Sequence, residues 1–396
     1  MKKVFICIFI FFFSMVTAQE IKKPYVILVS LDGFRWDYPK FFDTPNLDRM
    51  AKQGVKAKSM QPSYPTKTFP NHYSMATGLY PDHHGIVNNN FYDPATKKVF
   101  TLKTEAKKNG DFYGGNPIWN LAEAQGVKAV CFYWPGSDTG VKSASIFKAY
   151  DESVSYESRI NTVIDWLQLP EAERPHFITL YFEQPDETGH NYGPLSTENR
   201  KMVPKVDAVI GQLMQKLDAL PIGKEINLIV VSDHGMTTIS NDKKVAILDY
   251  LKPEWYGYAA VINPIMSIEA KAGYKEAIAD ALKKVPHIKW YRSNKVPKRL
   301  HFGTNPRALD FVIEADAGYS LVNKPDQKVS GGTHGYDNKM KDMQAIFYGK
   351  GPNFKIGKQV KSFRNVSVYP LIANILGLKI ETIDGDLDEV KGMLKN

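Results

Sequence analysis

Four short apolar runs, each followed at once by polar side chains, place the strongest constraint on how this chain can fold. They cover residues 25–30, 127–133, 176–182 and 226–232. Runs this apolar are typical of parallel strands that a sheet buries on both faces. Helical patterns lie between them, at residues 116–125, 157–168 and 197–219. The alternation of strands and helices predicts an α/β sandwich around a mostly parallel central sheet.

Three of these four runs lead into an aspartate. Asp32 follows the first run, Asp186 follows the third and Asp233 follows the fourth. A single aspartate after a strand is most often a turn residue or a helix cap. In a parallel sheet, however, ligands bind beyond the carboxyl ends of the strands. Three carboxylates delivered to that one edge therefore predict a functional site.

A different pattern between residues 240 and 328 predicts a small α+β insertion that could cap the site. We expect strands at 258–262, 289–292 and 309–314, and a helix at 268–284. The catalytic domain would then consist of residues 19–239 and 329–396, the second part holding a strand near 344–348 and a helix near 367–377.

The N-terminus reads as a secretory signal peptide over residues 1–18. Lys2 and Lys3 precede an apolar run, Val4–Phe13, which small residues close up to Ala18. An uncleaved membrane anchor is the alternative, but ten apolar residues are short for a span. We therefore expect a periplasmic or secreted protein without a stable membrane anchor after cleavage.

Cleavage would leave Cys131 as the only cysteine, in an apolar run, so we expect no intrachain disulfide. The net charge of +9 comes from dispersed lysines, which a solvated surface explains. There is no zinc-finger, helix-turn-helix or RNA-binding signature, so no nucleic-acid polymer partner is expected. A mild attraction for small anions remains open.

Three of the nine histidines stand in the company of carboxylates or glycines. His190 follows Asp186 by four residues, which on a helix would place both side chains on one face. His234 follows Asp233 directly, and His334 lies in a glycine-flanked loop. A lone histidine is more often a surface residue. Together, the carboxylates and imidazoles suit zinc, and two such sites would make a two-metal centre for phosphoryl chemistry.

A candidate nucleophile lies in the segment Tyr64–His72, which offers two hydroxyls, Thr66 and Thr68. A hydroxyl needs a metal ion or a base before it can attack at neutral pH. The prolines at positions 65 and 70 restrict the backbone and could fix the direction of the hydroxyl. A plain proline-bounded loop is the alternative.

Nine segments, in order along the chain, carry a family resemblance. They are Ser30–Arg35, Tyr64–His72, Thr77–Pro81 with His84–Ile86, Asn89 with Tyr92–Pro94, Gly115–Trp119, Trp134–Asp138, Tyr181–Glu183 with Pro185, Asp186, Gly189 and His190, Ser232–Met236, and His334–Asn338. The chain resembles the nucleotide pyrophosphatase/phosphodiesterase family of the alkaline phosphatase superfamily, and within it a compact bacterial member. This resemblance implies an alkaline-phosphatase-like α/β/α sandwich with a small α+β cap insertion.

The resemblance also implies roles for individual residues. Thr68 would be the nucleophile, and Asn89 with the Thr68 N–H would hold a phosphate oxygen. Phe69 and Tyr150 would form a slot for a nucleotide base. Two zinc ions would be bound, one by Asp186, His190 and His334, the other by Asp32, Asp233, His234 and the Thr68 oxygen.

The implied activity is an exported, zinc-dependent phosphodiesterase and nucleotide pyrophosphatase. It would hydrolyse nucleotide phosphodiester and phosphoanhydride bonds to nucleoside 5′-monophosphates through a covalent phosphothreonine. The alternatives are action on glycerophosphocholine or lysolipid-type diesters, a phosphomonoesterase on the same scaffold, and an inactive metal- or glycan-binding protein. The sequence leaves the physiological substrate and the oligomeric state open.

Overall fold

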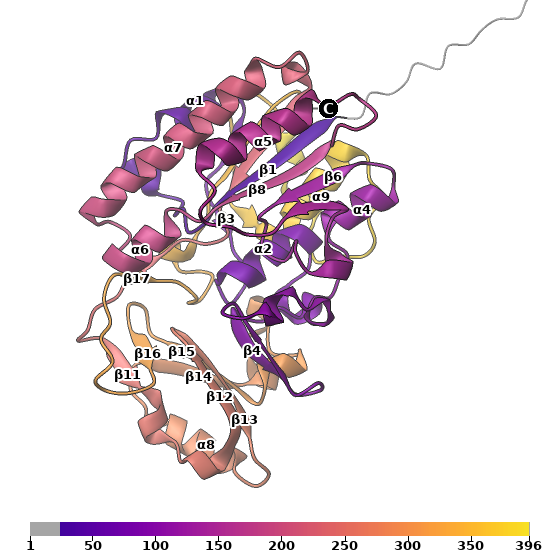
Figure 1. Cartoon of the computed structure of the whole chain (residues 1–396). Helices are drawn as coiled ribbons and strands as arrows, with labels where there is room; N and C mark the ends of the chain where they lie inside the picture. Colours follow the sequence, from indigo (N-terminus) through magenta and orange to yellow (C-terminus); the bar gives the residue numbers. More distant parts are fainter. Residues whose placement is uncertain (1–23, 396) are drawn as a thin grey trace, which may run out of the picture.

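The computed structural model describes residues 24–395, so the predicted signal peptide lies outside the described residues. An eight-stranded sheet crosses the upper part of the molecule (Figure 1). In spatial order its strands are β19 (Lys358–Val360), β2 (Val55–Ala57), β18 (Phe347–Lys350), β9 (Ile226–Val231), β1 (Tyr25–Leu31), β8 (Phe177–Phe182), β6 (Ala129–Phe132) and β7 (Ile146–Lys148). All pair in parallel except β18, which runs antiparallel to β9 and β2.

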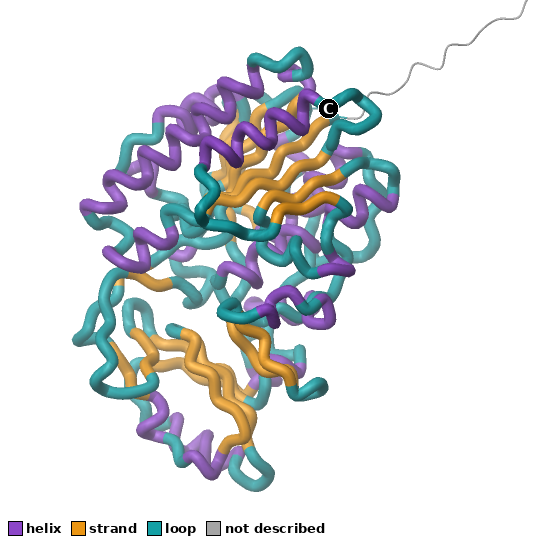
Figure 2. The backbone as a smooth tube through the Cα atoms, in the orientation of Figure 1, coloured by secondary structure: helices purple, strands orange, loops and turns teal. Residues whose placement is uncertain are grey.

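Helices cover both faces of this sheet, as the apolar runs predict (Figure 2). One face carries α1 (Pro45–Gln53), α5 (Tyr156–Gln168) and α7 (Thr197–Asp218); the other carries α2 (Thr68–Thr77), α4 (Ile118–Ala124) and α9 (Val368–Leu376). Successive residues of a strand point to opposite faces, so Ile27 and Val29 pack with the first layer while Val26 and Leu28 pack with the second. The fold is therefore the expected α/β sandwich.

The insertion forms a second body at the carboxyl edge of the sheet, below it in Figure 1. Its antiparallel sheet has the order β12 (Tyr256–Ile262), β13 (Ile265–Ala270), β15 (Phe311–Ala315) and β14 (Ile288–Arg292), with α8 (Lys275–Leu282) packed against it. The predicted helix at 268–284 is wrong in its first part. Residues 265–270 instead pair with β12 and β15, and Gly273, at a φ of +86°, breaks the chain before α8 begins.

Two short ladders lie where the chain enters and leaves the insertion. One pairs β10 (Thr237–Thr238) with β17 (Gly332–Thr333), and the other pairs β11 (Lys244–Ala246) with β16 (Ser320–Val322). The first ladder begins three residues after His234 and ends immediately before His334. The entry to the insertion and the exit from it thus lie directly beside two predicted metal ligands.

Glu314 of β15 is buried where the insertion meets the loop after His334. Only 4% of it is exposed, and its carboxylate accepts a hydrogen bond from the Asp337 N–H at 3.0 Å. Burial raises the pKa of Glu314 from 4.5 to about 7. Between these pH values the folded protein binds more protons than the unfolded chain, so this group costs stability as the pH rises through that window.

We expect Glu314→Gln to remove this cost. At pH 8 the variant should exceed the parent in free energy of unfolding by about 3 kcal/mol at most, because each pKa unit corresponds to about 1.4 kcal/mol. At pH 4 the two should differ little, since Gln keeps the acceptor for the Asp337 N–H. Urea unfolding at both pH values measures the difference, and an equal gap at the two pH values would contradict this account.

Candidate active site

The three aspartates converge because the strands before them are neighbours, in the order β9, β1, β8. Asp186 is the first residue of α6 (Asp186–Tyr192), and its N–H donates to the Asp32 carbonyl at 3.1 Å. The Gly33 N–H donates to Asp233 Oδ1, also at 3.1 Å. A Cβ on Gly33, which has a φ of +65°, would lie 2.8 Å from Asp186 Oδ1. Only glycine therefore allows this close approach.

The predicted ligands form two overlapping groups of potential metal donors. Asp32, Asp233 and His234 make one group, and Asp186, His234 and His334 make the other; in each, the donor atoms lie within 4.8 Å of one another. His190 joins the second group, because its Nε2 lies 3.1 Å from His334 Nε2. The six carboxylate and imidazole residues proposed as ligands are thus brought together, and His234 belongs to both groups.

Each of the three imidazoles is oriented by a backbone carbonyl. The Nδ1 contacts are His190 with Gly332 O at 2.9 Å, His234 with Gly235 O at 2.8 Å, and His334 with Thr66 O at 2.7 Å. A proton held on Nδ1 leaves the Nε2 lone pair facing the carboxylates. Metal-binding histidines are commonly fixed in this way.

The carboxylates are crowded in a manner that a divalent cation would relieve. Oδ1 of Asp32 and Oδ1 of Asp186 are buried and accept no hydrogen bond from any described residue. Burial and the nearby charges of Asp233 and Asp186 hold the pKa of Asp32 well above its usual range. Burial opposes the ionised form of Asp233 too, but His234, His72 and the Gly33 N–H together outweigh that effect and lower the pKa of Asp233. The donor set and its unpaired oxygens therefore fit a metal centre.

The structure separates the two candidate nucleophiles. Thr68 is the first residue of α2, and its Oγ1 lies 3.3 Å from His234 Nε2. The Thr66 hydroxyl is buried, donates to the Tyr336 carbonyl at 3.0 Å and accepts from the Gly335 N–H at 2.8 Å. Because both functions of the Thr66 hydroxyl are used in holding the loop, Thr68 is the one that faces the metal-ligand groups.

The start of α2 also orders the groups around Thr68. The Phe69 N–H donates to Asn89 Oδ1 at 2.9 Å. This bond uses the oxygen of the Asn89 amide and not its NH2 group, which is the donor of that side chain. One turn further on, Nδ1 of the buried His72 lies 2.9 Å from the Thr68 carbonyl, and its Nε2 lies 2.8 Å from Ser30 Oγ. The helix N-terminus adds the Thr68 N–H and a partial positive charge, which together favour an anion.

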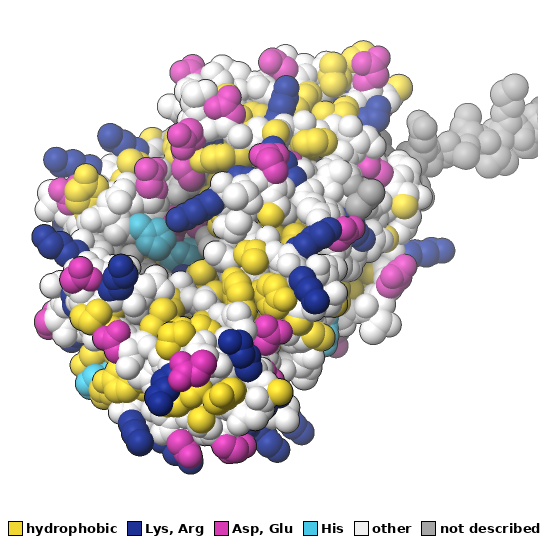
Figure 3. Space-filling model, turned by 60° about the horizontal axis from the view of Figure 1, so that its bottom comes forward, with side chains coloured by type: hydrophobic (Ala, Val, Ile, Leu, Met, Phe, Trp, Pro, Cys, Tyr) yellow, Lys and Arg dark blue, Asp and Glu magenta, His cyan; other side chains and the backbone are white. Residues whose placement is uncertain are grey.

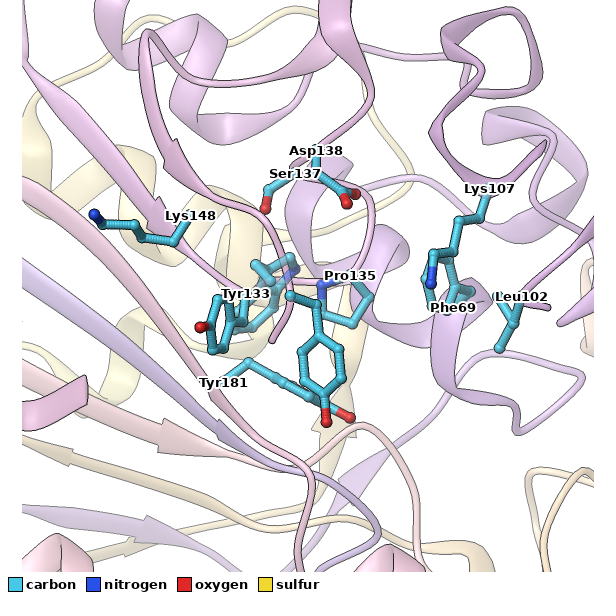
Figure 4. Close-up of a pocket in the computed structure, with 11 residues that line it drawn as sticks. Phe69, Leu102, Lys107, Tyr133, Pro135, Ser137, Asp138, Lys148 and Tyr181 are labelled. Carbon is cyan, nitrogen blue, oxygen red and sulfur yellow. The ribbon is translucent and has the colours of Figure 1, made fainter. Parts of the chain in front are cut away.

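A cavity of about 210 Å³ opens at Phe69, the residue after Thr68, with Phe69 on one side and tyrosines on the other (Figure 4). Its lining comprises Phe69, Leu102, Lys107, Tyr133, Trp134, Pro135, Ser137, Asp138, Lys148, Tyr150 and Tyr181. The structure thus brings Phe69 and Tyr150, the predicted base slot, to one cavity. Tyr181 connects the cavity to the ligand groups, since its phenol donates to Asp32 Oδ2 at 2.6 Å.

Most of the residues that line this cavity could not be predicted from the sequence. Trp134–Asp138 stood out as a motif after a strand, but nothing in it indicated a pocket wall. Lys107 and Leu102 come from a lysine-rich stretch that reads as solvated surface. From another side, the space-filling view shows histidines on the floor of a hollow with Lys and Arg side chains at its rim (Figure 3). The site is therefore open to solvent, and both basic and acidic side chains lie around it.

Comparison with known proteins agrees with this geometry. Residues 26–337 match the family described as type I phosphodiesterase/nucleotide pyrophosphatase. This chain belongs to that family. Over 388 residues it is 41% identical to ectonucleotide pyrophosphatase/phosphodiesterase family member 1 of Homo sapiens, covering 94% of this chain and 42% of the relative. A venom phosphodiesterase of Crotalus durissus collilineatus is 40% identical over 384 residues, covering 94% and 46%.

Solved structures of the family match as well. Murine ectonucleotide pyrophosphatase/phosphodiesterase 5, in an inactive threonine-to-alanine form in complex with AMP, superimposes with a TM-score of 0.90 at 31% identity. The match covers 94% of this phosphodiesterase-family chain and all of the murine one. The fold is thus a family property, although the chain spans less than half the length of the curated relatives given above.

Proposed function

We propose that this protein is a zinc-dependent phosphodiesterase and nucleotide pyrophosphatase that releases nucleoside 5′-monophosphates. The observation that carries the proposal is the aromatic cavity that Phe69 links to Thr68 and that Tyr181 links to Asp32. A nucleotide with its base in this cavity would bring its phosphate to the start of α2. The inactive murine relative in complex with AMP supports the same class of ligand.

Two zinc ions would be held by the residues already described. Asp186, His190 and His334 would hold one, and Asp32, Asp233, His234 and the Thr68 oxygen the other. When bound, zinc would favour the ionised form of the Thr68 hydroxyl and neutralise charge on the phosphate. His234 lies between the two groups, which is consistent with two neighbouring ions.

The chain's own residues would carry two displacements. Thr68 Oγ1 would attack phosphorus in line, forming a phosphothreonine as the bond to the leaving group breaks. Asn89 NH2 and the Thr68 N–H would hold a non-bridging oxygen of the phosphate. In other enzymes, removing one such donor lowers kcat by about 10²–10³-fold. Water would then attack the phosphothreonine, release the monophosphate and restore the threonine.

Tyr150 would hold the base from the side opposite Phe69. It is 43% exposed and meets the rings of Tyr133 and Tyr181 at centroid distances of 5.3 and 6.1 Å. We expect Tyr150→Ala to lower kcat/KM for p-nitrophenyl thymidine 5′-monophosphate about tenfold or more, since stacking contributes about 1–3 kcal/mol per base. Methyl p-nitrophenyl phosphate, which has no base, should lose less than about twofold; an equal loss on both substrates would contradict the slot.

The alternatives fit the site less well. Lys107, Lys148 and Asp138 line the cavity, and the net positive charge of these three side chains opposes a choline headgroup. A phosphomonoesterase usually needs an additional cation for a dianionic phosphate. The nearest candidate, Lys67, is 5% exposed and donates from Nζ to the Asn263 carbonyl at 2.6 Å, so it is already engaged.

A substrate panel tests the proposal. The purified protein would be assayed with p-nitrophenyl thymidine 5′-monophosphate, ATP, p-nitrophenyl phosphate and glycerophosphocholine. We expect kcat/KM for the two nucleotides to exceed that for the other two by about 10²-fold or more, because only the nucleotides fill the cavity. A preference for glycerophosphocholine or for the monoester would overturn the assignment in favour of that alternative.

We also propose that the enzyme acts after export, with 19–239 and 329–396 as its catalytic domain and 240–328 as its cap. The export proposal rests on the signal-like residues 1–18. Across residues 24–395, no helix combines the length and the apolar character that a membrane crossing requires.

A further inference from the structure

Arg307 of the insertion packs its side chain into the catalytic domain, away from the metal-ligand groups. Arg307 lies just before β15, and its side chain is 14% exposed. Nε and Nη2 donate to Asp93 Oδ2 at 3.2 and 2.9 Å. Nη1 donates to two backbone carbonyls, Gly85 at 2.9 Å and Phe112 at 2.6 Å. One guanidinium therefore ties together three segments of the catalytic domain.

The surroundings of this guanidinium form a fitted socket. It stacks over the rings of Phe91 and Phe112, with centroid distances of 5.4 and 5.3 Å. A Cβ on Gly85, whose φ is +85°, would lie 2.6 Å from Nη1, so glycine is needed there. The Asp93 side chain is 6% exposed; burial raises its pKa, but Arg307 more than compensates and holds it below the usual range. A lysine could not reproduce this planar set of contacts.

The loop that carries Arg307 is itself anchored. Asp82 of α3 (Pro81–His84) accepts from the Gly303 N–H at 3.0 Å and from the Thr304 N–H at 2.6 Å. The Asn305 amide donates to the Asp82 carbonyl at 2.8 Å. These bonds fix the loop against the catalytic domain before the chain reaches Arg307, so the guanidinium is presented in one position.

The segment that Arg307 holds leads directly to the site. Asp93 ends β4 (Asn90–Asp93), which pairs with β5 (Lys98–Thr101) and lies beside the insertion in Figure 1. Asn89 immediately precedes this hairpin. Within it, Phe91 stacks on Phe100 at 4.8 Å, and Phe100 meets the edge of Phe69 at 5.9 Å. Both Asn89 and Phe69 thus depend on where the hairpin is held.

We propose that Arg307 is a positioning residue through which the insertion sets Asn89 and Phe69 for phosphoryl transfer. The kinetic consequences of this inference rest on the proposed function. The clamp, meaning the contacts of Arg307 with Asp93, Gly85 and Phe112, does not depend on that function. Through this clamp, the insertion would fix the position of the residues that form the substrate pocket. The orientation of Asn89 would then be decided by a residue more than 200 positions away in the sequence.

The first test is kinetic. Arg307→Met is expected to lower kcat for p-nitrophenyl thymidine 5′-monophosphate about tenfold or more, with Arg307→Lys recovering little. In an Asn89→Ala background, the same Arg307→Met change should cost less than about twofold, because the group it positions is gone. The matched control is Arg292→Met, whose guanidinium binds Glu276 inside the insertion; it should leave kcat unchanged.

The second test does not need turnover. Amide hydrogen exchange over residues 89–101 should accelerate at least about tenfold in Arg307→Met, and not in Arg292→Met. If Arg307→Met does not fold, Asp93→Asn removes the same pair from the other side. Equal kinetic losses with and without Asn89, or unchanged exchange in the hairpin, would overturn the proposal. If the parent enzyme shows no nucleotide turnover, the proposed function fails, while the exchange comparison still decides the clamp.

Discussion

Replacing Thr68 with alanine is expected to lower kcat for nucleotide esters by about 10⁴-fold or more, the scale seen when an enzyme nucleophile is removed. The Thr68 oxygen lies at the start of α2, 3.3 Å from His234 Nε2. From this position an alkoxide could attack a phosphate bound at the helix N-terminus. The Thr66 hydroxyl cannot take its place, because it is held by Tyr336 and Gly335. Rates of p-nitrophenol release measure the effect.

Two companion variants sharpen this prediction. Thr68→Ser keeps a hydroxyl and should retain well over a hundred times the activity of Thr68→Ala. Thr66→Val removes only the loop bonds, so it should affect stability more than kcat. Metal content should remain high in Thr68→Ala, since the six carboxylate and imidazole residues proposed as ligands persist. If Thr68→Ala kept activity within tenfold of the parent, Thr68 would not be the nucleophile.

Removal of bound metal is expected to have the second largest effect, on both stability and activity. Without a cation, Asp32, Asp186 and Asp233 face one another with buried, unpaired oxygens. A ligand at about a thousand times its Kd stabilises the folded state by about 4 kcal/mol. A chelator should therefore lower Tm by at least about 5 °C and reduce turnover by about 10³-fold, with zinc restoring both.

The matched variants for this prediction are His334→Ala and His287→Ala. His334 belongs to a ligand group, whereas His287 stacks on Tyr319 in the insertion, at a centroid distance of 4.0 Å. The chelator-induced shift in Tm should shrink in His334→Ala and persist in His287→Ala. A parent protein whose Tm and metal content do not respond to chelation would contradict the metal centre.

The strands and the metal-ligand groups could be predicted because both follow local rules. Apolar runs define β1, β8 and β9, and adjacent parallel strands must deliver their following residues to one edge. The choice between Thr66 and Thr68 needed more. It depends on the Thr66 hydroxyl bonding to residues 270 positions away, which no local pattern contains.

The pocket lining and the contacts of Arg307 could not be predicted either, because both depend on residues that are far apart in the sequence. The cavity combines Leu102 and Lys107 with Tyr181 from a distant segment, and lysines on a loop read as solvated until the fold places them. The end of strand β13, residues 268–270, reads as helix until its partners β12 and β15 are known. In each case tertiary contacts outweigh the local preference.

The stereochemistry of hydrolysis tests the central claim most directly. A nucleoside 5′-(α-thio)triphosphate, chiral at the α-phosphorus, would be hydrolysed in ¹⁸O-labelled water and the configuration of the thiomonophosphate determined. Each in-line displacement inverts phosphorus. Attack by Thr68 followed by attack by water therefore predicts overall retention. Inversion would mean that water displaces the leaving group in a single step, and would contradict a phosphothreonine intermediate.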